Sequence, residues 1–291
     1  MKFIARLRVL PEGGTIRATG NARPQWTIKG ADGAILVLQG LHLVGADLLL
    51  TGKFASVQIR CATLDPGNSG ADLTPAAAFA SAADGQTLWP TRLFVEAEII
   101  ELSITQSITG PIKTQNNGSI ETLRISDSIV QALPETLGQP APPAIKSESG
   151  ETHLSRTTVL GALSVHRLDA SECILDDIAV AEDAQHGCIR FSAYAEGSVV
   201  HQPYESVTVA QQAELFRSRD FGHPQYARLR DTADQAIITG GSGASIMAGA
   251  EDGSEMGAFY REKIPLKRRG LDQKFAEFMP IGQVPVWIDA T

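Results

Sequence analysis

Three aspartates stand beside a repeated pattern on predicted strands, where they could carry out acid–base chemistry. Asp127 lies in the segment ISDSI, and Asp176 and Asp177 lie in the segment ILDDI. Hydrolysis of a glycosidic bond needs two carboxyl groups, an acid for the leaving oxygen and a partner that serves as base or nucleophile. Asp127 precedes its repeat anchor by one residue, whereas Asp176 follows its anchor by three. We therefore expect these acids on different walls of the fold, and a surface or turn role is favoured over catalysis.

A second acidic segment, GAEDGSEMGAF, occupies residues 249–259. Its carboxylates, Glu251, Asp252 and Glu255, could bind a cation or cap helix N-termini, and Ser254 could begin a helix. Its glycines recur every fourth residue and permit tight turns or close backbone approach. The spacing does not match an EF-hand loop, which needs ligands at alternate positions. A turn that fixes the C-terminal region on the rest of the chain is favoured, with a metal or substrate site as the alternative.

Cysteine and histidine offer little further chemistry. Cys61, Cys173 and Cys188 are widely spaced without a CxxC pair, and the six histidines have neither HxH nor HxxxH spacing. We therefore expect no metal, no cofactor and no disulfide framework, and we expect the cysteines to be buried as small apolar residues. His186 and Cys188 fall on the same face of a strand, but no third orienting residue accompanies them, so nucleophilic catalysis there is disfavoured.

The elements that position these residues follow a short template. A Ser, Thr or Cys anchor is followed by an aliphatic residue, with another aliphatic five places after the anchor. The anchors Ser107, Ser128, Thr158 and Cys173 are 21, 30 and 15 residues apart, and Thr63 begins a partial match. A β-solenoid repeats its strands while loops of any length leave at the corners. The template therefore predicts a β-solenoid.

Composition divides the chain into two regions. Short apolar runs broken by glycines are typical of strands, and we expect a β-solenoid over residues 1–187 that opens with an N-terminal strand segment. Loop excursions are expected at residues 65–92 and 134–150, which are rich in small, polar and proline residues. The composition changes after residue 187, and we expect a mixed, partly helical capping region over residues 188–291.

Helical spacing of apolar residues appears in the C-terminal region at three places. It predicts helices near residues 207–218, 224–229 and 270–279. In the last of these, Leu271, Phe275 and Phe278 would share one face. Such a region could cover the open end of a solenoid, whose terminal layer would otherwise be an aggregation edge.

The overall charge and the lengths of the apolar stretches argue against some classes of function. A net charge of -8 over 291 residues argues against broad nucleic-acid binding, which needs a cationic surface. The longest basic run, residues 267–269, is better explained as a solvated helix start. No stretch approaches the ~18 apolar residues of a membrane span, and the N-terminus has the alternation of a strand rather than a signal peptide. We expect a cytoplasmic or particle-associated protein without membrane insertion.

Five segments resemble motifs of a family of large, mostly uncharacterised bacterial β-helix proteins, often encoded beside phage-tail-like or contractile injection components. In chain order they are SITGPI (107–112), DSIVQA (127–132), GCIRFS (187–192), LFRSRDFGHPQYARL (215–229) and GAEDGSEMGAF (249–259). The resemblance covers roughly residues 55–285. It implies an all-β dominated fold, a right-handed parallel β-helix with a small, partly helical cap. This chain is shorter than members of that family usually are.

The resemblance brings no assigned catalytic residue with it, but it marks a candidate contact or structural motif. The residues of this motif are Cys188, Arg190, Phe191, Gly249, Glu251, Asp252, Gly253, Ser254, Glu255, Met256, Gly257 and Phe259. The expected function is a non-enzymatic structural or accessory component of a phage-tail-like contractile particle. Its partners would be other protein subunits or a second copy of the chain. The alternative is a carbohydrate-active or carbohydrate-binding β-helix protein, resembling a glycoside hydrolase or lyase, with a polysaccharide as partner.

Overall fold

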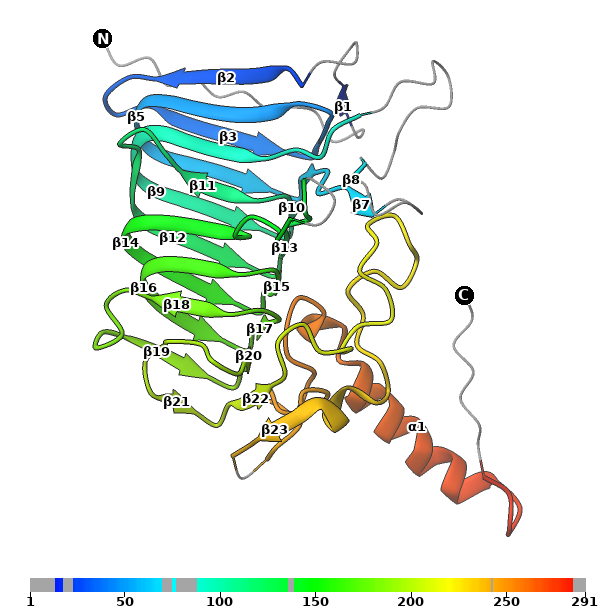
Figure 1. Ribbon diagram of the computed structural model, residues 1–291. Coiled ribbons are helices and arrows are strands. Elements are labelled where there is room, and N and C mark those ends of the chain that lie inside the picture. Colours follow the sequence, from blue (N-terminus) through cyan, green and yellow to red (C-terminus); the bar gives the residue numbers. More distant parts are fainter. Residues whose placement is uncertain are drawn as a thin grey trace.

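The structure, a computed structural model, describes residues 14–17, 23–69, 75–76, 88–135, 139–241 and 243–284. Strands dominate this part of the chain, and its single α-helix lies near the C-terminus (Figure 1). The strand-dominated fold expected from the sequence is confirmed. The predicted N-terminal strand segment at residues 3–9 lies outside the described residues.

Ten strands of the described chain pair into one sheet, which we call the first sheet. All its pairs are parallel except the last. In sheet order the strands are β1 (Gly14–Arg17), β4 (Leu41–Val44), β6 (Thr63–Leu64), β10 (Ile108–Thr109), β13 (Ile129–Gln131), β15 (Thr158–Leu160), β17 (Ile174–Leu175), β20 (Ala193–Ala195), β22 (Val207–Val209) and β23 (Ile237–Thr239). Ile108, Ile129, Thr158 and Ile174 follow one another in register across four neighbouring strands.

Eleven described strands form the second sheet, and its pairs are parallel. They are β2 (Gln25–Gly30), β3 (Ile35–Gln39), β5 (Asp47–Arg60), β9 (Leu93–Thr105), β11 (Ile112–Thr114), β12 (Ser119–Ser126), β14 (Ile145–Ser155), β16 (Leu163–Ser171), β18 (Ala179–Ala181), β19 (Gly187–Arg190) and β21 (Pro203–Tyr204). The long strands β9 and β14 each pair with both β11 and β12, which closes a small ring of pairings within this sheet.

The chain passes alternately through the second and the first sheet, and each round adds one layer to the stack (Figure 1). For example, β14 leads into β15 and β16 leads into β17, while β14 pairs with β16 and β15 pairs with β17. The layers continue past residue 187 as far as β22. The excursion after β6 contains the antiparallel pair β7 (Asn68–Ser69) and β8 (Pro75–Ala76), and β14 begins within the second predicted excursion.

Aliphatic side chains from both sheets form one continuous core. Along β9, buried and more exposed residues alternate over most of the strand, because successive side chains point to opposite faces. Leu43 and Val159 of the first sheet belong to the same cluster as Leu50 and Ile104 of the second. Each fully buried aliphatic side chain contributes roughly 1.5–3 kcal/mol. The layered sheets are therefore a rigid scaffold for the segments that leave them.

In six successive layers, from β9–β10 to β21–β22, a sharp corner joins the end of the second-sheet segment to the next strand of the first sheet. The residue at the bend has a positive φ, of 50° at Gln106, 48° at Asp127, 50° at Arg156, 58° at Glu172, 49° at Phe191 and 45° at Glu205. The next side chain donates a hydrogen bond to the carbonyl two residues earlier. These residues, which we call the corner ladder, are Ser107, Ser128, Thr157, Cys173, Ser192 and Ser206.

The corner ladder offsets the strain at the bends, since a left-handed residue other than glycine costs about 1–2 kcal/mol. Besides donating, four of its hydroxyl groups accept a backbone N–H from the preceding layer. For example, Ser192 accepts from the Cys173 amide at 3.0 Å and donates to the Arg190 carbonyl at 2.8 Å. Polar side chains are thus buried at the corners with their hydrogen bonds satisfied.

The corner ladder also corrects the predicted repeat. Ser107, Ser128 and Cys173 occupy equivalent corners, as the template predicts, but Thr158 does not. Thr158 pairs with Ile129 and Ile174, which follow their anchors, so its neighbour Thr157 is the true equivalent. The template also places its anchor one residue too late at Thr63, because Thr63 pairs with Ile108, which follows the anchor Ser107.

After β22 the described chain forms turns, isolated bridges, the strand β23 and three helices. These helices are η1 (Ala233–Ala236), η2 (Tyr260–Glu262) and α1 (Ile264–Phe278). The predicted helices at 207–218 and 224–229 are wrong, because Phe216 and Leu229 instead face each other in an antiparallel bridge. The helix predicted at 270–279 is confirmed, and it begins earlier, at Ile264, with a proline in its first turn.

A second apolar cluster holds the C-terminal region against the first sheet. It joins Ile129, Ile174 and Val207 of the sheet to Phe216 and Met256 of the C-terminal region. Hydrogen bonds reinforce this contact: the Tyr226 hydroxyl donates to the Gln131 side-chain oxygen at 2.6 Å, and the Gln131 amide donates to the Arg219 carbonyl at 2.7 Å. The C-terminal region is thereby anchored on one face of the stack.

Candidate functional site

The segment 249–259 lies directly against the first sheet. The backbone N–H of Gly257 donates to the Glu172 carbonyl at 2.8 Å, and the N–H of Ala258 donates to the Thr158 hydroxyl at 3.0 Å. A Cβ on Gly257, whose φ is 89°, would lie 2.5 Å from the Thr158 hydroxyl oxygen. Only glycine permits this close approach without displacement.

Within this segment, Asp252 stabilises a turn. Its carboxylate accepts the Ser254 N–H at 2.9 Å and the Lys263 ammonium at 2.6 Å. Burial opposes ionisation, but these hydrogen bonds prevail and lower the pKa of Asp252 to about 2. Gly253 provides the positive φ of the turn, Glu251 is exposed, and Met256 is buried in the second apolar cluster.

Asp127 links the corner of the sheets to the C-terminal region. Arg156 donates to both of its oxygens at 2.6 and 3.1 Å, and Arg261 donates to the same two oxygens at 2.8 and 3.0 Å. Burial raises the pKa of Asp127, but the two guanidinium groups outweigh burial and leave that pKa below its usual range. Arg156 therefore forms an ion pair at this corner.

Asp176 and Asp177, which directly follow β17, also make contacts with the C-terminal region. The Arg219 guanidinium donates to both oxygens of buried Asp176, and burial leaves the pKa of Asp176 raised although Arg219 opposes this. Asp177 accepts from the side chains of Gln211 at 2.6 Å and Gln212 at 2.8 Å. All three catalytic candidates thus direct both carboxyl oxygens at groups that tie the C-terminal region down.

The remaining members of the candidate motif lie at or near the end of the stack. Cys188 is exposed on β19, Arg190 donates to the Ser171 hydroxyl at 3.1 Å, and Phe191 packs edge-to-face on Tyr204 with ring centroids 5.8 Å apart. His186 contacts Asp183.

The three cysteines have different environments. Cys61 and Cys188 are exposed, whereas Cys173 is buried in the corner ladder. The prediction that all three are buried is therefore wrong for two. Burial raises the pKa of the Cys173 thiol to about 12, so it stays protonated as a donor to the Ser171 carbonyl.

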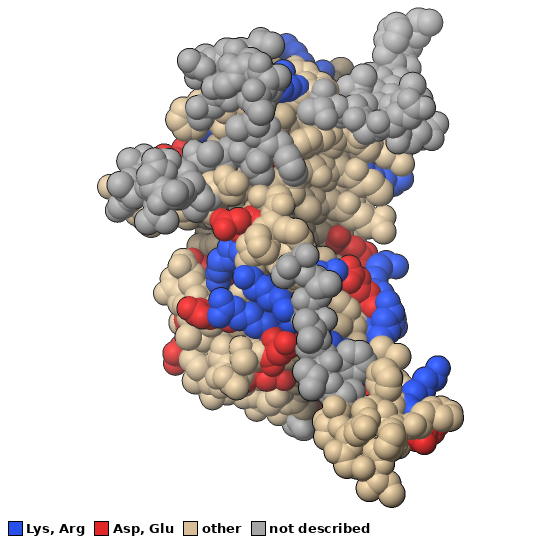
Figure 2. Space-filling model, turned by 90° about the vertical axis from the view of Figure 1, so that its right-hand side faces the viewer, with Lys and Arg blue, Asp and Glu red and all other residues tan. Residues whose placement is uncertain are grey.

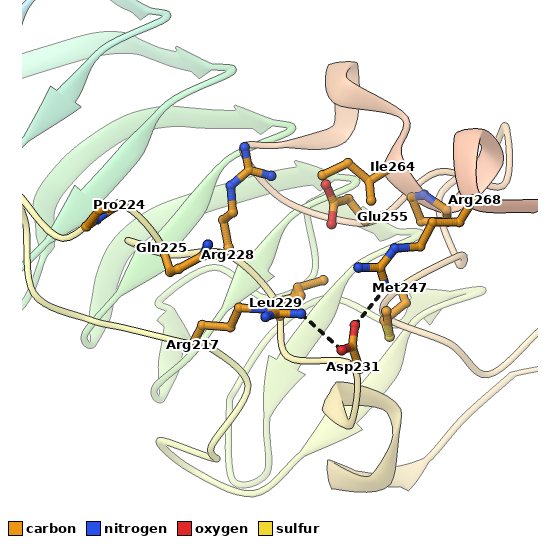
Figure 3. Close-up of a pocket in the computed structure, with 11 residues that line it drawn as sticks. Arg217, Pro224, Gln225, Arg228, Leu229, Asp231, Met247, Glu255, Ile264 and Arg268 are labelled. Atoms are coloured by element: carbon orange, nitrogen blue, oxygen red, sulfur yellow. Dashed lines mark hydrogen bonds and ion pairs between the residues drawn. The ribbon is translucent and has the colours of Figure 1, made fainter. Parts of the chain in front are cut away.

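A pocket of about 340 Å³ lies between three segments of the C-terminal region (Figure 3). We call it the arginine pocket, since guanidinium groups of Arg217, Arg228 and Arg268 line it. The other lining residues are Pro224, Gln225, Leu229, Asp231, Met247, Glu255, Ile264 and Pro265. Its volume is in the range of small-ligand sites. Figure 2 shows basic side chains gathered on the face that carries the C-terminal region, with acidic ones at their margin.

Carboxylates hold the arginines in place. Asp231 accepts from Arg217 at 3.0 Å and from Arg268 at 2.8 Å, so one carboxylate bridges two guanidinium groups (Figure 3). Arg228 donates to both oxygens of Glu262 at 3.0 and 2.8 Å and stacks on Phe259, with its guanidinium carbon 4.8 Å from the ring centroid. The guanidinium groups are thus pre-oriented at the pocket wall.

Glu255 differs from every other acid described above. It is only 6% exposed, and its Oε1 accepts no hydrogen bond from the described residues. Figure 3 places its carboxyl group between Arg228 and Arg268. Burial raises the pKa of Glu255 to about 7, and Glu262 adds to this, while Arg228 and Arg268 act in the opposite direction. Near neutral pH this carboxyl group can both donate and accept protons.

The sequence marked Glu255 as a candidate but missed the arginines around it. Arg217 and Arg228 lie in the segment 215–229, which was noted for its resemblance and for predicted helices, and Arg268 was assigned to a solvated helix start. These residues are far apart in sequence and meet only because the turns of the C-terminal region fold back on the first sheet. The spacing carries no signal that could have found them.

Helix α1 contributes Ile264, Pro265 and Arg268 to the arginine pocket, but residues 269–278 of the helix are exposed. Figure 1 shows it projecting away from the sheets. None of its residues is buried, and Leu271 and Phe278, on its apolar face, are 42% and 83% exposed. Among the described residues, none of the helices has the length and apolar character needed to span a bilayer.

Comparisons of the chain with family models, with curated proteins and with solved structures find no match. Within the described residues, no three His, Cys, Asp or Glu side chains gather as the ligands of a metal ion would.

Proposed function

We propose that the two sheets form a right-handed β-solenoid and that the protein is a non-enzymatic structural or accessory component of a phage-tail-like contractile particle. The solenoid is supported by the alternation of the chain between the sheets and by the in-register parallel pairing of successive layers. The right hand follows from the strong preference of parallel crossover connections. The particle assignment rests on the five motif resemblances and their order.

One observation carries the idea that the protein acts through protein contacts, and it is the exposure of α1. A helix of 15 residues normally gains most of its stability by packing an apolar face. Here Leu271 and Phe278 share one face at helical spacing, and both side chains are exposed. Exposed apolar faces of this kind mark interaction surfaces. In the proposed particle this face packs on a neighbouring subunit.

The carbohydrate-active alternative has less support. Hydrolysis needs two carboxyl groups that face substrate in a groove. Asp127, Asp176 and Asp177, the acids that the sequence offered for this role, direct their oxygens at arginine or glutamine side chains. The proposal therefore keeps the non-enzymatic role.

Affinity capture from cells of the native source tests the proposal. A tagged chain should recover sheath, tube or baseplate subunits, identified by mass spectrometry. Replacing Leu271→Glu together with Phe278→Glu should abolish recovery, because both charges would enter the apolar contact. The matched control, Gln273→Glu with Ala276→Glu, adds the same charge on the opposite side of α1 and should leave recovery unchanged. Absence of particle subunits from the wild-type capture would reject the particle role.

A further inference from the structure

The arginine pocket has the features of a built ligand site rather than a gap between loops. Its walls come from three separate segments, which contribute Arg217 and Arg228, then Glu255, then Arg268. Each arginine is only partly exposed, and ion pairs to Asp231 or Glu262 fix its orientation. Pre-oriented donors around a concave volume are what specific small-molecule sites provide.

We propose that the arginine pocket binds a small organic oxyanion, a molecule that presents a carboxylate, sulfate or phosphate group to the guanidinium groups and a hydrogen-bond acceptor to Glu255. This site is independent of the protein contacts proposed above.

The balance of charge favours an anion. Among the residues that line the pocket, three guanidinium groups stand against the carboxyl groups of Asp231 and Glu255, so the lining itself carries an excess of positive charge, which is larger when Glu255 is protonated. Guanidinium groups recognise oxyanions through paired N–H donors. Ile264 and Pro265, in the first turn of α1, also line the pocket, so the positive end of the helix dipole lies at its wall.

Glu255 gives the pocket its second point of recognition. A buried carboxyl oxygen without a hydrogen-bond partner costs about 1–3 kcal/mol, and proteins rarely leave such groups unsatisfied. In its protonated form, Glu255 can donate its proton to an oxygen of a bound anion. In its ionised form it repels the same anion. Binding and protonation of Glu255 are therefore coupled.

Apolar atoms make up part of the wall. Leu229, Met247 and Pro224 line the pocket together with the two residues that open α1. These groups suit the carbon skeleton of an organic molecule rather than a bare ion. Glucuronate combines a carboxylate with a ring of suitable size and is a fitting probe, while sulfate tests the oxyanion group alone and glucose tests the ring alone.

The direction of the pH effect follows from this coupling. Glu255 has a pKa of about 7 in the folded protein, and an anion binds the protonated form, so affinity is highest below pH 7 and falls as the pH rises. If only the protonated form binds, the dissociation constant rises about tenfold between pH 6 and pH 8. Sulfate and glucuronate keep a constant charge across this interval, so the change reports the protein.

Titration calorimetry of the full chain with sulfate, glucuronate and glucose at pH 6 and pH 8 tests the proposal. We expect saturable binding of glucuronate, weaker binding of sulfate and none of glucose. Saturation by sulfate with no response to glucuronate would overturn the organic ligand. Saturation by glucose equal to that by glucuronate would overturn the oxyanion, and no saturation by either anion would overturn the site.

Three variants locate the binding. Glu255→Gln should keep the affinity at pH 6 within about twofold and lose the pH dependence, because a neutral amide replaces the titrating group. Arg228→Gln and Arg268→Gln should each weaken binding about tenfold or more. The matched control is Arg230→Gln, because Arg230 lies in the same region, pairs with Glu214 and does not line the pocket. Equal loss in Arg230→Gln, or an unchanged pH dependence in Glu255→Gln, would overturn the proposal.

Discussion

The corner ladder and the arginine pocket both bury polar side chains, but they treat them in opposite ways. At the corner, Ser192 accepts one N–H and donates to one carbonyl, so its hydroxyl group is fully used within the protein. In the pocket, Glu255 is almost as buried, yet its Oε1 receives no hydrogen bond from the described residues. The hydroxyl group at the corner finds its hydrogen-bond partners within the protein, whereas a bound ligand would have to supply the partner of the carboxyl oxygen in the pocket.

The corner ladder thus contributes to stability, whereas the arginine pocket is the region with a proposed function. Satisfied buried polar groups specify a unique packing, while an unsatisfied one is a cost that a functional site can justify. Between the two regions lie the contacts that join them, made by Gly257, Asp176 and Asp127. Changes at the junction should have the largest effect, changes in the corner a smaller one, and changes on the outer face of the sheets the smallest.

The largest effect is expected for Gly257→Ala at the junction. The new Cβ would lie 2.5 Å from the Thr158 hydroxyl and 2.9 Å from Ile174 Cδ1, at a φ of 89°. Overpacking and backbone strain together should lower the free energy of unfolding by about 3–4 kcal/mol, measured by urea denaturation. Gly253→Ala is the matched control, because its φ is 78° and the nearest atom lies 3.9 Å away. It should cost about 1 kcal/mol, and equal losses in the two variants would contradict the close approach.

The next largest effect is expected for Asp176→Ala, which removes the buried partner of Arg219. The change should cost about 3 kcal/mol, because the guanidinium group stays partly buried without its counter-ion. The C-terminal region should also loosen locally, and the urea unfolding transition should therefore become broader. Asp169→Ala removes a carboxylate that is 42% exposed and should change stability by less than about 0.5 kcal/mol. A comparable loss there would mean that Asp176 has no special role.

A smaller effect is expected for Ser192→Ala in the corner ladder. The substitution leaves the buried Cys173 amide without its acceptor and should cost about 1.5 kcal/mol. Thermal unfolding followed by circular dichroism is sufficient to detect this. Ser103→Ala, at an outward position of β9 between buried Leu102 and Ile104, should be nearly neutral. If both serines prove neutral, the corner ladder does not stabilise the bends.

The smallest effect is expected on the outer face of the second sheet. Arg124 and Glu101 form a pair at 3.4 Å between exposed side chains on neighbouring strands. Arg124→Ala should change the free energy of unfolding by about 0–0.5 kcal/mol, and the change should vanish in 0.5 M salt. A loss above 1 kcal/mol would show that surface charge contributes to the scaffold as much as the corner does.

Much of the layered fold could be predicted from the sequence because each layer repeats the same short pattern of side chains. The alternation in β9 and the Ser or Cys after a bend are short-range signals, and they placed Ser107, Ser128 and Cys173 correctly. Thr157 and Thr158 are adjacent and chemically alike, so their order could be decided only by the pairing of Thr158 with Ile129. The predicted repeat therefore slipped by one residue there.

The C-terminal region was harder to predict because its contacts are long-range. Val209, Ala213 and Phe216 have helical spacing, but Phe216 packs across the chain on Leu229, and this tertiary contact overrides the local pattern. Segment 249–259 was recognised as acidic and rich in glycine, which identified Glu255. Its arginine neighbours come from positions near 217, 228 and 268, and only the folded chain brings them together.

The titration of Glu255 tests most directly whether the pocket contains a buried carboxyl group that binds a ligand. Carbon-13 NMR of glutamate-labelled protein, with Glu255→Gln to assign the signal, would follow this one side chain from pH 4 to pH 9. We predict a midpoint of about 7, which moves upward when glucuronate is added. A midpoint near 4.5, the ordinary value for glutamate, or a midpoint that glucuronate leaves unchanged, would contradict the account.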